Sequence, residues 1–277
     1  MRHFIKTFIL LMFLTCLLLV VGYYAGGLYG FAFMLLFVVI INLFSYWFSD
    51  KIILKMYKAT EVDHGSRPEI YLMVDELSRK AEIPTPRIFV SPHKSPNAFA
   101  TGRNPSHGVV CLTQGLIQNL DENELKGVIA HELSHIKHWD ILIHMIAATM
   151  AGIVSSVAYI LRFSLIFAGG RKRGLGTLIG SLALFILAPI VAVLIQLAIS
   201  RSREYAADIG SARITGNPMY LANALAKISQ HSQADLHKAR NTAHFFIASP
   251  LKKNFLGNLF RTHPPIEERI TKLKEMI

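Results

Sequence analysis

Long uninterrupted runs of apolar residues alternate along this chain with segments of mixed polarity. The runs lie at about 7–24, 28–48, 141–161 and 177–200, and a run of this length can cross the hydrocarbon core of a bilayer as a helix. Tyrosine and tryptophan residues stand near the ends of the first two runs, where aromatic side chains favour the membrane interface. The pattern predicts a membrane protein with about four hydrophobic helices.

The first two runs predict a transmembrane hairpin over residues 1–49 with both ends in the cytoplasm. Arg2 and Lys6 precede the first run, and Lys51 and Lys55 follow the second. Basic residues favour the cytoplasmic side of a membrane. The first run is longer than the apolar core of a signal peptide, so it fits a membrane span better.

Between the second and third runs, the chain has the periodicities of a small folded domain. The apolar positions of 70–81 predict an amphipathic helix, which Pro84 and Pro86 end. Short strands are predicted at 87–90, 98–101 and 109–112, and helices at 115–120, 218–230 and 264–277.

A further helix is predicted from Glu122 to about Lys137. Asp121 stands at its N-cap and Glu124 three residues later, which is the spacing of a capping box. The apolar residues that follow recur at helical spacing. They are Leu125, Val128, Ile129, Leu133 and Ile136.

This helix carries the pattern HExxH, as His131-Glu132-Leu133-Ser134-His135. Two histidines four residues apart share one helix face, so both imidazoles can reach one tetrahedral Zn²⁺. Glu132 points about 100° away around the helix, where it can take a proton from a water at the metal but is not aimed to ligate. An exposed helix with two scattered histidines is the alternative, but it leaves the capped, amphipathic helix unexplained.

A catalytic zinc site needs a third protein ligand. His138 returns nearly to the face of His131, but it lies about 10 Å further along the helix axis, which disfavours one shared metal. Glu204 and Asp208 are four residues apart on a predicted helix, so that one could ligate while the other supports an imidazole. Ordinary surface pairing with neighbouring arginines would also explain these two acids, and spacing alone leaves both interpretations open.

Composition narrows the class of protein further. Of 277 residues, 52% are hydrophobic and 17% charged, and the mean hydropathy is +0.39, which supports membrane insertion. The formal net charge of +11 lies largely beside the apolar runs, so lipid headgroups explain it better than nucleic acid does. Cys16 and Cys111 lack CxxC spacing, which argues against a disulfide scaffold or a cysteine-based zinc site.

Four motifs, occurring in family order, make the sequence resemble a known family. It resembles the HtpX family of membrane metalloproteases, which is related to the CAAX prenyl proteases. This resemblance covers most of the chain and implies a gluzincin-like protease domain that is mainly α-helical with a small β-sheet. The motifs are His-Glu-Leu-Ser-His at 131–135, Arg203 to Asp208, Asn97 to Gly102, and Thr262-His263-Pro264-Pro265 with Glu268-Arg269.

The resemblance also implies roles for single residues. Glu204 would be the third ligand of one Zn²⁺ per chain, with Asp208 as its support. His263 and Arg269 would lie near the zinc and stabilise the oxyanion. The substrate would add as a β-strand beside Asn97, Ala98, Phe99 and Ala100, with Asn97 facing the site.

We expect four segments. Residues 1–49 form the hairpin, 50–140 hold the HExxH helix, and 201–277 hold the third zinc ligand. Residues 141–200 form a second hydrophobic hairpin, spanning or partly inserted. If it spans, its basic tip at 171–173 lies outside, against the positive-inside rule.

The function that the resemblance implies is zinc-dependent cleavage of misfolded or damaged membrane proteins in a stress response, with Glu132 as general base. It implies a multi-pass protein of the bacterial cytoplasmic (inner) membrane whose active site faces the cytoplasm. The expected partners are membrane protein substrates, the lipid bilayer and other membrane quality-control proteases, and no nucleic acid.

Two alternatives stay open at this point. The first is processing of one defined peptide, such as a prenylated tail. The second is a transporter or membrane scaffold with a structural metal. That class needs polar or broken helices along a path through the bilayer, whereas the first, second and fourth runs hold almost no charge.

Overall fold

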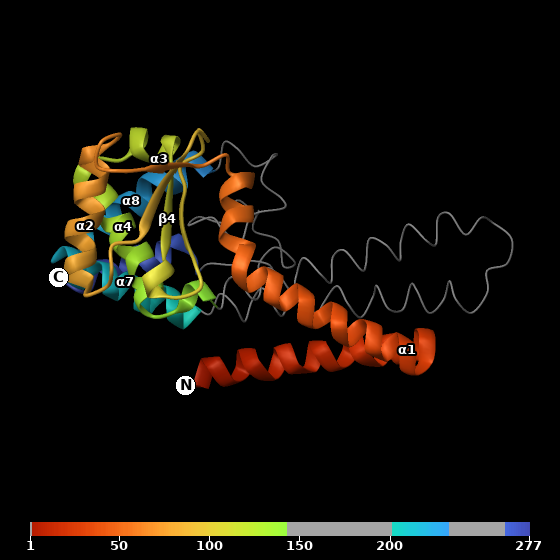
Figure 1. The fold of residues 1–277 in the computed structure, drawn as a ribbon. Helices are drawn as coiled ribbons and strands as arrows, with labels where there is room; N and C mark the ends of the chain where they lie inside the picture. The colour runs from red at the N-terminus through yellow and green to blue at the C-terminus, as the bar shows by residue number, and fades with distance from the viewer. Residues whose placement is uncertain (1, 143–200, 233–263) are drawn as a thin grey trace, which may run out of the picture. The chain divides into compact units, whose positions relative to one another are not determined.

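The computed structural model describes residues 2–142, 201–232 and 264–277 (Figure 1). The chain divides into two compact units, one of 1–46 with 146–198 and one of 47–145 with 199–277. The hydrophobic hairpin predicted at 141–200 lies outside the described residues from 143 onward, as does His263. The crossings predicted for that hairpin and the role of His263 therefore stay predictions.

Helix α1 (Arg2–Met56) contains both of the first two apolar runs. It reverses direction within its length (Figure 1), and Gly27 has a φ of 60°, a value that glycine adopts without strain. Because of the reversal, a Cβ on Gly22 would lie 2.6 Å from Cγ of Met34. The turn falls between the two predicted runs. Among the described residues, no helix has the combined length and apolar character that a membrane crossing needs.

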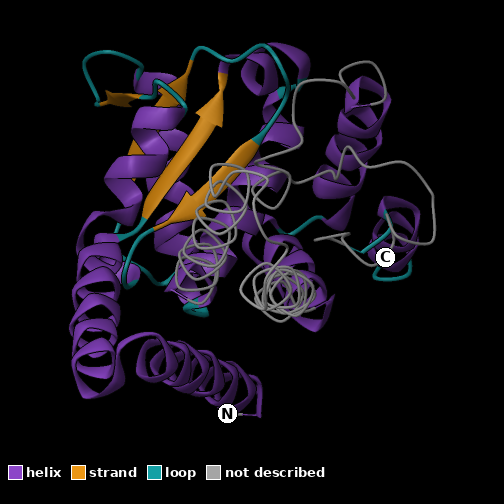
Figure 2. Cartoon of the chain, turned by 90° about the vertical axis from the view of Figure 1, so that its right-hand side faces the viewer, coloured by secondary structure: helices purple, strands orange, loops and turns teal. Residues whose placement is uncertain are grey.

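The second unit is built around a four-stranded sheet of order β1-β2-β4-β3 (Figure 2). β1 (Thr60–Val62) pairs antiparallel with β2 (Arg87–Ser91), β2 pairs parallel with β4 (Val109–Thr113), and β4 pairs antiparallel with β3 (Ala98–Thr101). β3 is therefore an edge strand, and among the described strands it pairs only with β4.

Both faces of this sheet are covered. One face packs on the last turns of α1 through a cluster that includes Ile53, Tyr57 and Phe99. The other face contributes Val110 and Leu112 to the main core, which the apolar sides of the helices complete. These helices are α2 (Pro68–Ala81), α3 (Gln114–Asn119), α4 (Glu122–Lys137), α7 (Arg201–Thr215), α8 (Pro218–Ser232) and α10 (Ile266–Lys274).

The structure confirms the elements that hydrophobic periodicity predicted, within a few residues at their ends. α10 begins at Ile266 rather than at the predicted 264 because Pro265 is its N-cap. β1 was not predicted, since three residues are too few to show alternation. It is held to β2 by a bidentate ion pair between Glu61 and Arg87, with N–O distances of 2.7 and 2.8 Å.

Candidate metal centre

The predicted capping box starts α4. The Asp121 side chain accepts from the backbone N–H of Glu124, and the Glu124 side chain accepts from the backbone N–H of Asp121. Glu124 also accepts from Lys227 of α8 at 2.7 Å. The start of α4 is thus fixed by its own residues and by a neighbouring helix, three turns before its histidines.

α7 lies unusually close to α4. A Cβ on Gly210 would lie 2.1 Å from the Oγ of Ser134, so only glycine fits without a shift. The next residue, Ser211, donates a hydrogen bond of 2.7 Å to the carbonyl oxygen of Gly127. These two contacts set the register between the helices, and they place Glu204 of α7 over the histidines of α4.

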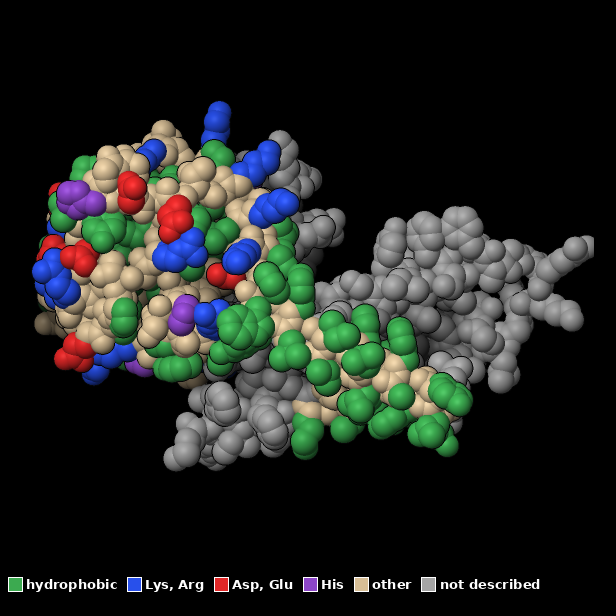
Figure 3. All heavy atoms as spheres, in the orientation of Figure 1, with side chains coloured by type: hydrophobic (Ala, Val, Ile, Leu, Met, Phe, Trp, Pro, Cys, Tyr) green, Lys and Arg blue, Asp and Glu red, His purple; other side chains and the backbone are tan. Residues whose placement is uncertain are grey.

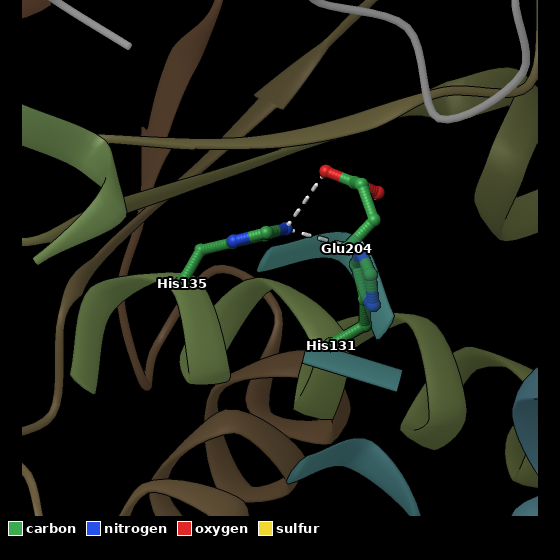
Figure 4. Close-up of side chains that lie close together, drawn as sticks. All are labelled: His131, His135 and Glu204. Carbon is green, nitrogen blue, oxygen red and sulfur yellow. Dashed lines mark hydrogen bonds and ion pairs between the residues drawn. The ribbon is translucent and has the colours of Figure 1, made fainter. Parts of the chain in front are cut away.

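Three buried side chains meet at one point (Figure 4). The Nε2 atoms of His131 and His135 are 3.2 Å apart. One Glu204 oxygen lies 3.7 Å from Nε2 of His131, and the other lies 3.5 Å from Nε2 of His135. The structure thus brings the three predicted ligands together, although Glu204 is separated from the histidines by the whole of 141–200.

These separations fit a tetrahedral metal ion. Zinc bonds of about 2.0–2.1 Å to nitrogen and oxygen put neighbouring ligand atoms about 3.3–3.5 Å apart, close to the three distances above. Two imidazole nitrogens and a carboxylate are also the donors that zinc accepts in catalytic sites. The residues therefore fit a zinc ion with a further coordination position open.

Each imidazole is fixed from behind by a carboxylate. Nδ1 of His131 lies 3.0 Å from Asp208, and Nδ1 of His135 lies 3.1 Å from Asp140. Burial alone would lower the pKa of His135, but the hydrogen bond to Asp140 and the charges of Glu204 and Asp140 outweigh burial and raise it, so a metal ion must displace a proton from this imidazole on binding. With Nδ1 engaged, both Nε2 atoms face the common point, which is the arrangement of metal-ligating histidines.

Two buried arginines complete the site. Arg269 of α10 donates two hydrogen bonds to Asp208, at 2.9 and 2.7 Å, and its Nη1 lies 3.7 Å from Glu204. Burial would raise the pKa of Asp208, but the charge of Arg269 and the hydrogen bonds from His131 and Arg269 lower it. Arg203 of α7 approaches Asp140, with an N–O distance of 3.6 Å.

Carboxylates outnumber guanidinium groups among the described buried residues of the site. Four buried carboxylates and two buried guanidinium groups lie in and around this site. Buried charges are tolerated where they are paired or coordinate a metal. The carboxylates are Glu132, Asp140, Glu204 and Asp208, and the guanidinium groups are those of Arg203 and Arg269.

Two further predicted site residues, Glu132 and Asn97, are buried. Glu132 is buried on α4 between the two histidines in sequence. Burial, and to a smaller extent the charge of Glu132, raise the pKa of the Cys111 thiol to about 12. Asn97 is buried at the start of β3, where its backbone N–H donates to the hydroxyl of Thr113 at 2.8 Å.

Sequence reasoning missed two residues of this centre and correctly set one aside. His138 is exposed at the C-cap of α4, so it does not join the ligands. Asp140 and Arg203 were not assigned a role. Their signals were weak: an acid just past the end of the HExxH helix, and an arginine beside a candidate ligand. Asp140 and Arg203 come together only because the turn that ends α4 directs Asp140 inward.

Comparison with known proteins agrees with this geometry. The sequence model of peptidase family M48 matches residues 66–277. The chain is 49% identical to a protein named "Protease HtpX homolog" from Desulforapulum autotrophicum, covering 99% of this chain and 90% of the relative. A protein of the same name from Persephonella marina is 50% identical, covering 99% and 97%. These names match the family that the sequence motifs resemble.

The comparison with solved structures concerns the fold. A crystal structure of S. mikatae Ste24p superimposes with a TM-score of 0.55 at 17% sequence identity, covering 98% of this chain and 66% of that one. At this identity the likeness concerns the fold alone. This chain spans about two thirds of the length of that protein.

Proposed function

This chain belongs to peptidase family M48 and is a metalloprotease, and we propose that it is a zinc-dependent endopeptidase of membrane proteins. The observation that carries the proposal is the meeting of His131, His135 and Glu204, whose ligand atoms all lie within 4.8 Å of one another. The fit of these distances to a tetrahedral ion and the donor set of two imidazoles and a carboxylate support zinc as the metal.

When bound, zinc would polarise the scissile carbonyl and make water a better nucleophile. Glu132 takes a proton from the attacking water and returns it to the leaving amine, since it follows His131 directly and is buried beside the ligands. For the oxyanion we propose Arg269 together with His263. Arg269 suits this role because it carries a fixed positive charge and its Nη1 lies 3.7 Å from the proposed ligand Glu204.

The substrate would bind along β3, at Asn97, Ala98, Phe99 and Ala100. β3 is an edge strand that packs on α4, so a peptide paired with its outer edge would run beside the histidines. Backbone pairing uses hydrogen bonds that every peptide offers. It therefore suits an enzyme that accepts many unfolded sequences better than one that processes a single defined tail.

A location in the bacterial cytoplasmic membrane is the second part of the proposal. Apolar side chains stand exposed along α1 (Figure 3), including Leu28 at 75%, Tyr29 at 91% and Phe33 at 66%. Exposed apolar patches of this kind mark contact with lipid or protein. An enzyme held in the bilayer would meet damaged membrane proteins directly, with its active site on the cytoplasmic side and other quality-control proteases as partners.

The test combines metal content with proteolysis. The purified chain should contain one zinc ion and cleave an unfolded protein such as casein, and a chelator should abolish cleavage until zinc is restored. For the substrate class, the variant E132Q should be crosslinked in cells to membrane proteins, and more of them after heat stress. Capture of a single peptide species would favour the processing function, and zinc binding without any proteolysis would favour a structural metal.

A further inference from the structure

The two imidazoles of the metal centre are held by similar three-residue arrangements. In the first, Nδ1 of His131 lies 3.0 Å from Asp208, and Asp208 is bound by Arg269 at 2.9 and 2.7 Å. All three side chains are buried. The order is imidazole, carboxylate and guanidinium, and Arg269 comes from α10, a different helix from that of Asp208.

The second arrangement repeats this order with other residues. Nδ1 of His135 lies 3.1 Å from Oδ2 of Asp140, and the other oxygen of Asp140 lies 3.6 Å from Nη1 of Arg203. These side chains are buried as well. Arg203 directly precedes Glu204 in the first turn of α7, so this arrangement links two metal ligands from two helices.

Asp140 reaches His135 through an unfavourable turn. α4 ends at Lys137, and Trp139 adopts a φ of 63°, a left-handed conformation that few residues other than glycine adopt. The Trp139 side chain is 49% exposed, whereas the next two residues, Asp140 and Ile141, are buried. The left-handed conformation of Trp139 therefore serves to bury the two residues that follow it, because the Trp139 side chain itself is only partly packed.

We propose that Asp140, held by Arg203, is a positioning residue for the metal centre. Asp140 accepts the Nδ1 proton of His135, which leaves the lone pair on Nε2 and directs it toward the ion. Arg203 balances the buried carboxylate and ties the end of α4 to the first turn of α7. The inference rests on the proposed zinc function and adds a second supporting carboxylate to Asp208.

The contacts rank the expected effects. Asp140 lies against the imidazole itself, with an O–N distance of 3.1 Å to Nδ1 of His135, whereas Arg203 acts on the imidazole only through Asp140. Asp140→Asn keeps the shape but removes the charge, and should weaken zinc binding roughly ten- to a hundredfold. Arg203→Gln should weaken it less than Asp140→Asn does, and Arg203→Lys less again, because lysine keeps the charge.

The experiment measures zinc affinity in the purified full chain by competition with a chromophoric chelator. D140N is compared with the wild type and with D75N, a matched change at a partly buried aspartate that is also paired with an arginine, Arg79. Unfolding of the metal-free proteins is measured in parallel. Cobalt(II) is then substituted, because its visible absorption depends on the arrangement of the ligands around the ion.

The proposal predicts weaker zinc binding and an altered cobalt spectrum for D140N, with D75N like the wild type. The double variant D140N/R203Q should bind zinc about as weakly as D140N, since Arg203 acts through Asp140. Wild-type zinc affinity and an unchanged cobalt spectrum in D140N would overturn the inference. If D140N does not fold, R203Q decides, and wild-type binding by it contradicts the role of the pair. A wild-type chain that binds no zinc would instead contradict the proposed function itself.

Discussion

Ser134 and Gly210 touch where α4 crosses α7, so closely that a Cβ on Gly210 would lie 2.1 Å from Oγ and 2.9 Å from Cβ of Ser134. Ser134 lies inside the HExxH sequence, and Gly210 lies six residues after Glu204. The contact lets α7 approach α4 closely enough for Glu204 to meet His131 and His135. A glycine far from any substrate thus contributes to the geometry of the metal centre.

Replacing this glycine should separate the helices. Gly210→Ala should lower the free energy of unfolding by about 1–3 kcal/mol, because the added methyl overpacks the crossing, and it should also weaken zinc binding. Gly65→Ala is the control, since its Cβ meets only Asp63 at an ordinary 3.6 Å. Adding Ser134→Ala to Gly210→Ala should restore part of the loss. Urea unfolding measures these differences, and equal stability of G210A and G65A would show that the close approach is unimportant.

The buried pair of Arg269 and Asp208 predicts a large effect on stability. Arg269→Gln leaves Asp208 charged and buried, so it should lower the free energy of unfolding by about 3–5 kcal/mol. Arg269→Lys should also destabilise the protein, because lysine cannot reproduce the bidentate hydrogen bonds. Unfolding is measured in the presence of chelator, so that metal loss is not counted. The exposed control Arg79→Gln should change stability by less than about 1 kcal/mol, and an R269Q chain as stable as R79Q would contradict this account.

The pair of Glu61 and Arg87 predicts a pH dependence. The hydrogen bond and charge of Arg87 hold the pKa of Glu61 below its usual 4.5. Its contribution is therefore fully present above about pH 4.5 and is lost as the pH falls through the lower pKa of the folded state. Both side chains are about half exposed, so we expect only about 0.5 kcal/mol. The difference in unfolding free energy between wild type and E61Q should shrink from pH 7 to pH 3. A difference that grows over this range would contradict a stabilising role of the charged Glu61.

Glu132→Gln separates chemistry from metal binding. The variant should keep one zinc ion, because Glu132 is not among the residues whose ligand atoms meet. It should cleave casein roughly 10²- to 10⁴-fold more slowly, as expected for the loss of a general base. Glu122→Gln on the same helix is the control, since Glu122 is exposed and pairs with Lys126. Normal cleavage by E132Q would exclude Glu132 as the base.

Local patterns predicted the local structure of this protein well. The capping box at Asp121 and the helical spacing after it fixed the bounds of α4, because a helix is defined by contacts three and four residues apart. The strands of the sheet were found the same way, except β1, whose three residues carry no alternation.

The tertiary part of the site was harder to predict. Spacing alone left Glu204 equally explained by surface pairing, and only the resemblance to a family singled it out. Its approach to the histidines depends on the contact between Ser134 and Gly210, which joins distant segments. The position of Asp140 beside His135 depends on the left-handed conformation of Trp139. A tryptophan in the sequence does not predict that conformation. The roles of His263 and of the hydrophobic segment 141–200 stay predictions.

The central claim is that His131, His135 and Glu204 hold one zinc ion, and zinc stoichiometry after dialysis against a weak chelator tests it most directly. We expect one zinc per chain in the wild type, and in Glu275→Ala, an exposed glutamate at the end of α10. Glu204→Ala should retain far less than one, because two imidazoles alone make an incomplete site. A Glu204→Ala chain that keeps one tightly bound zinc would contradict the account.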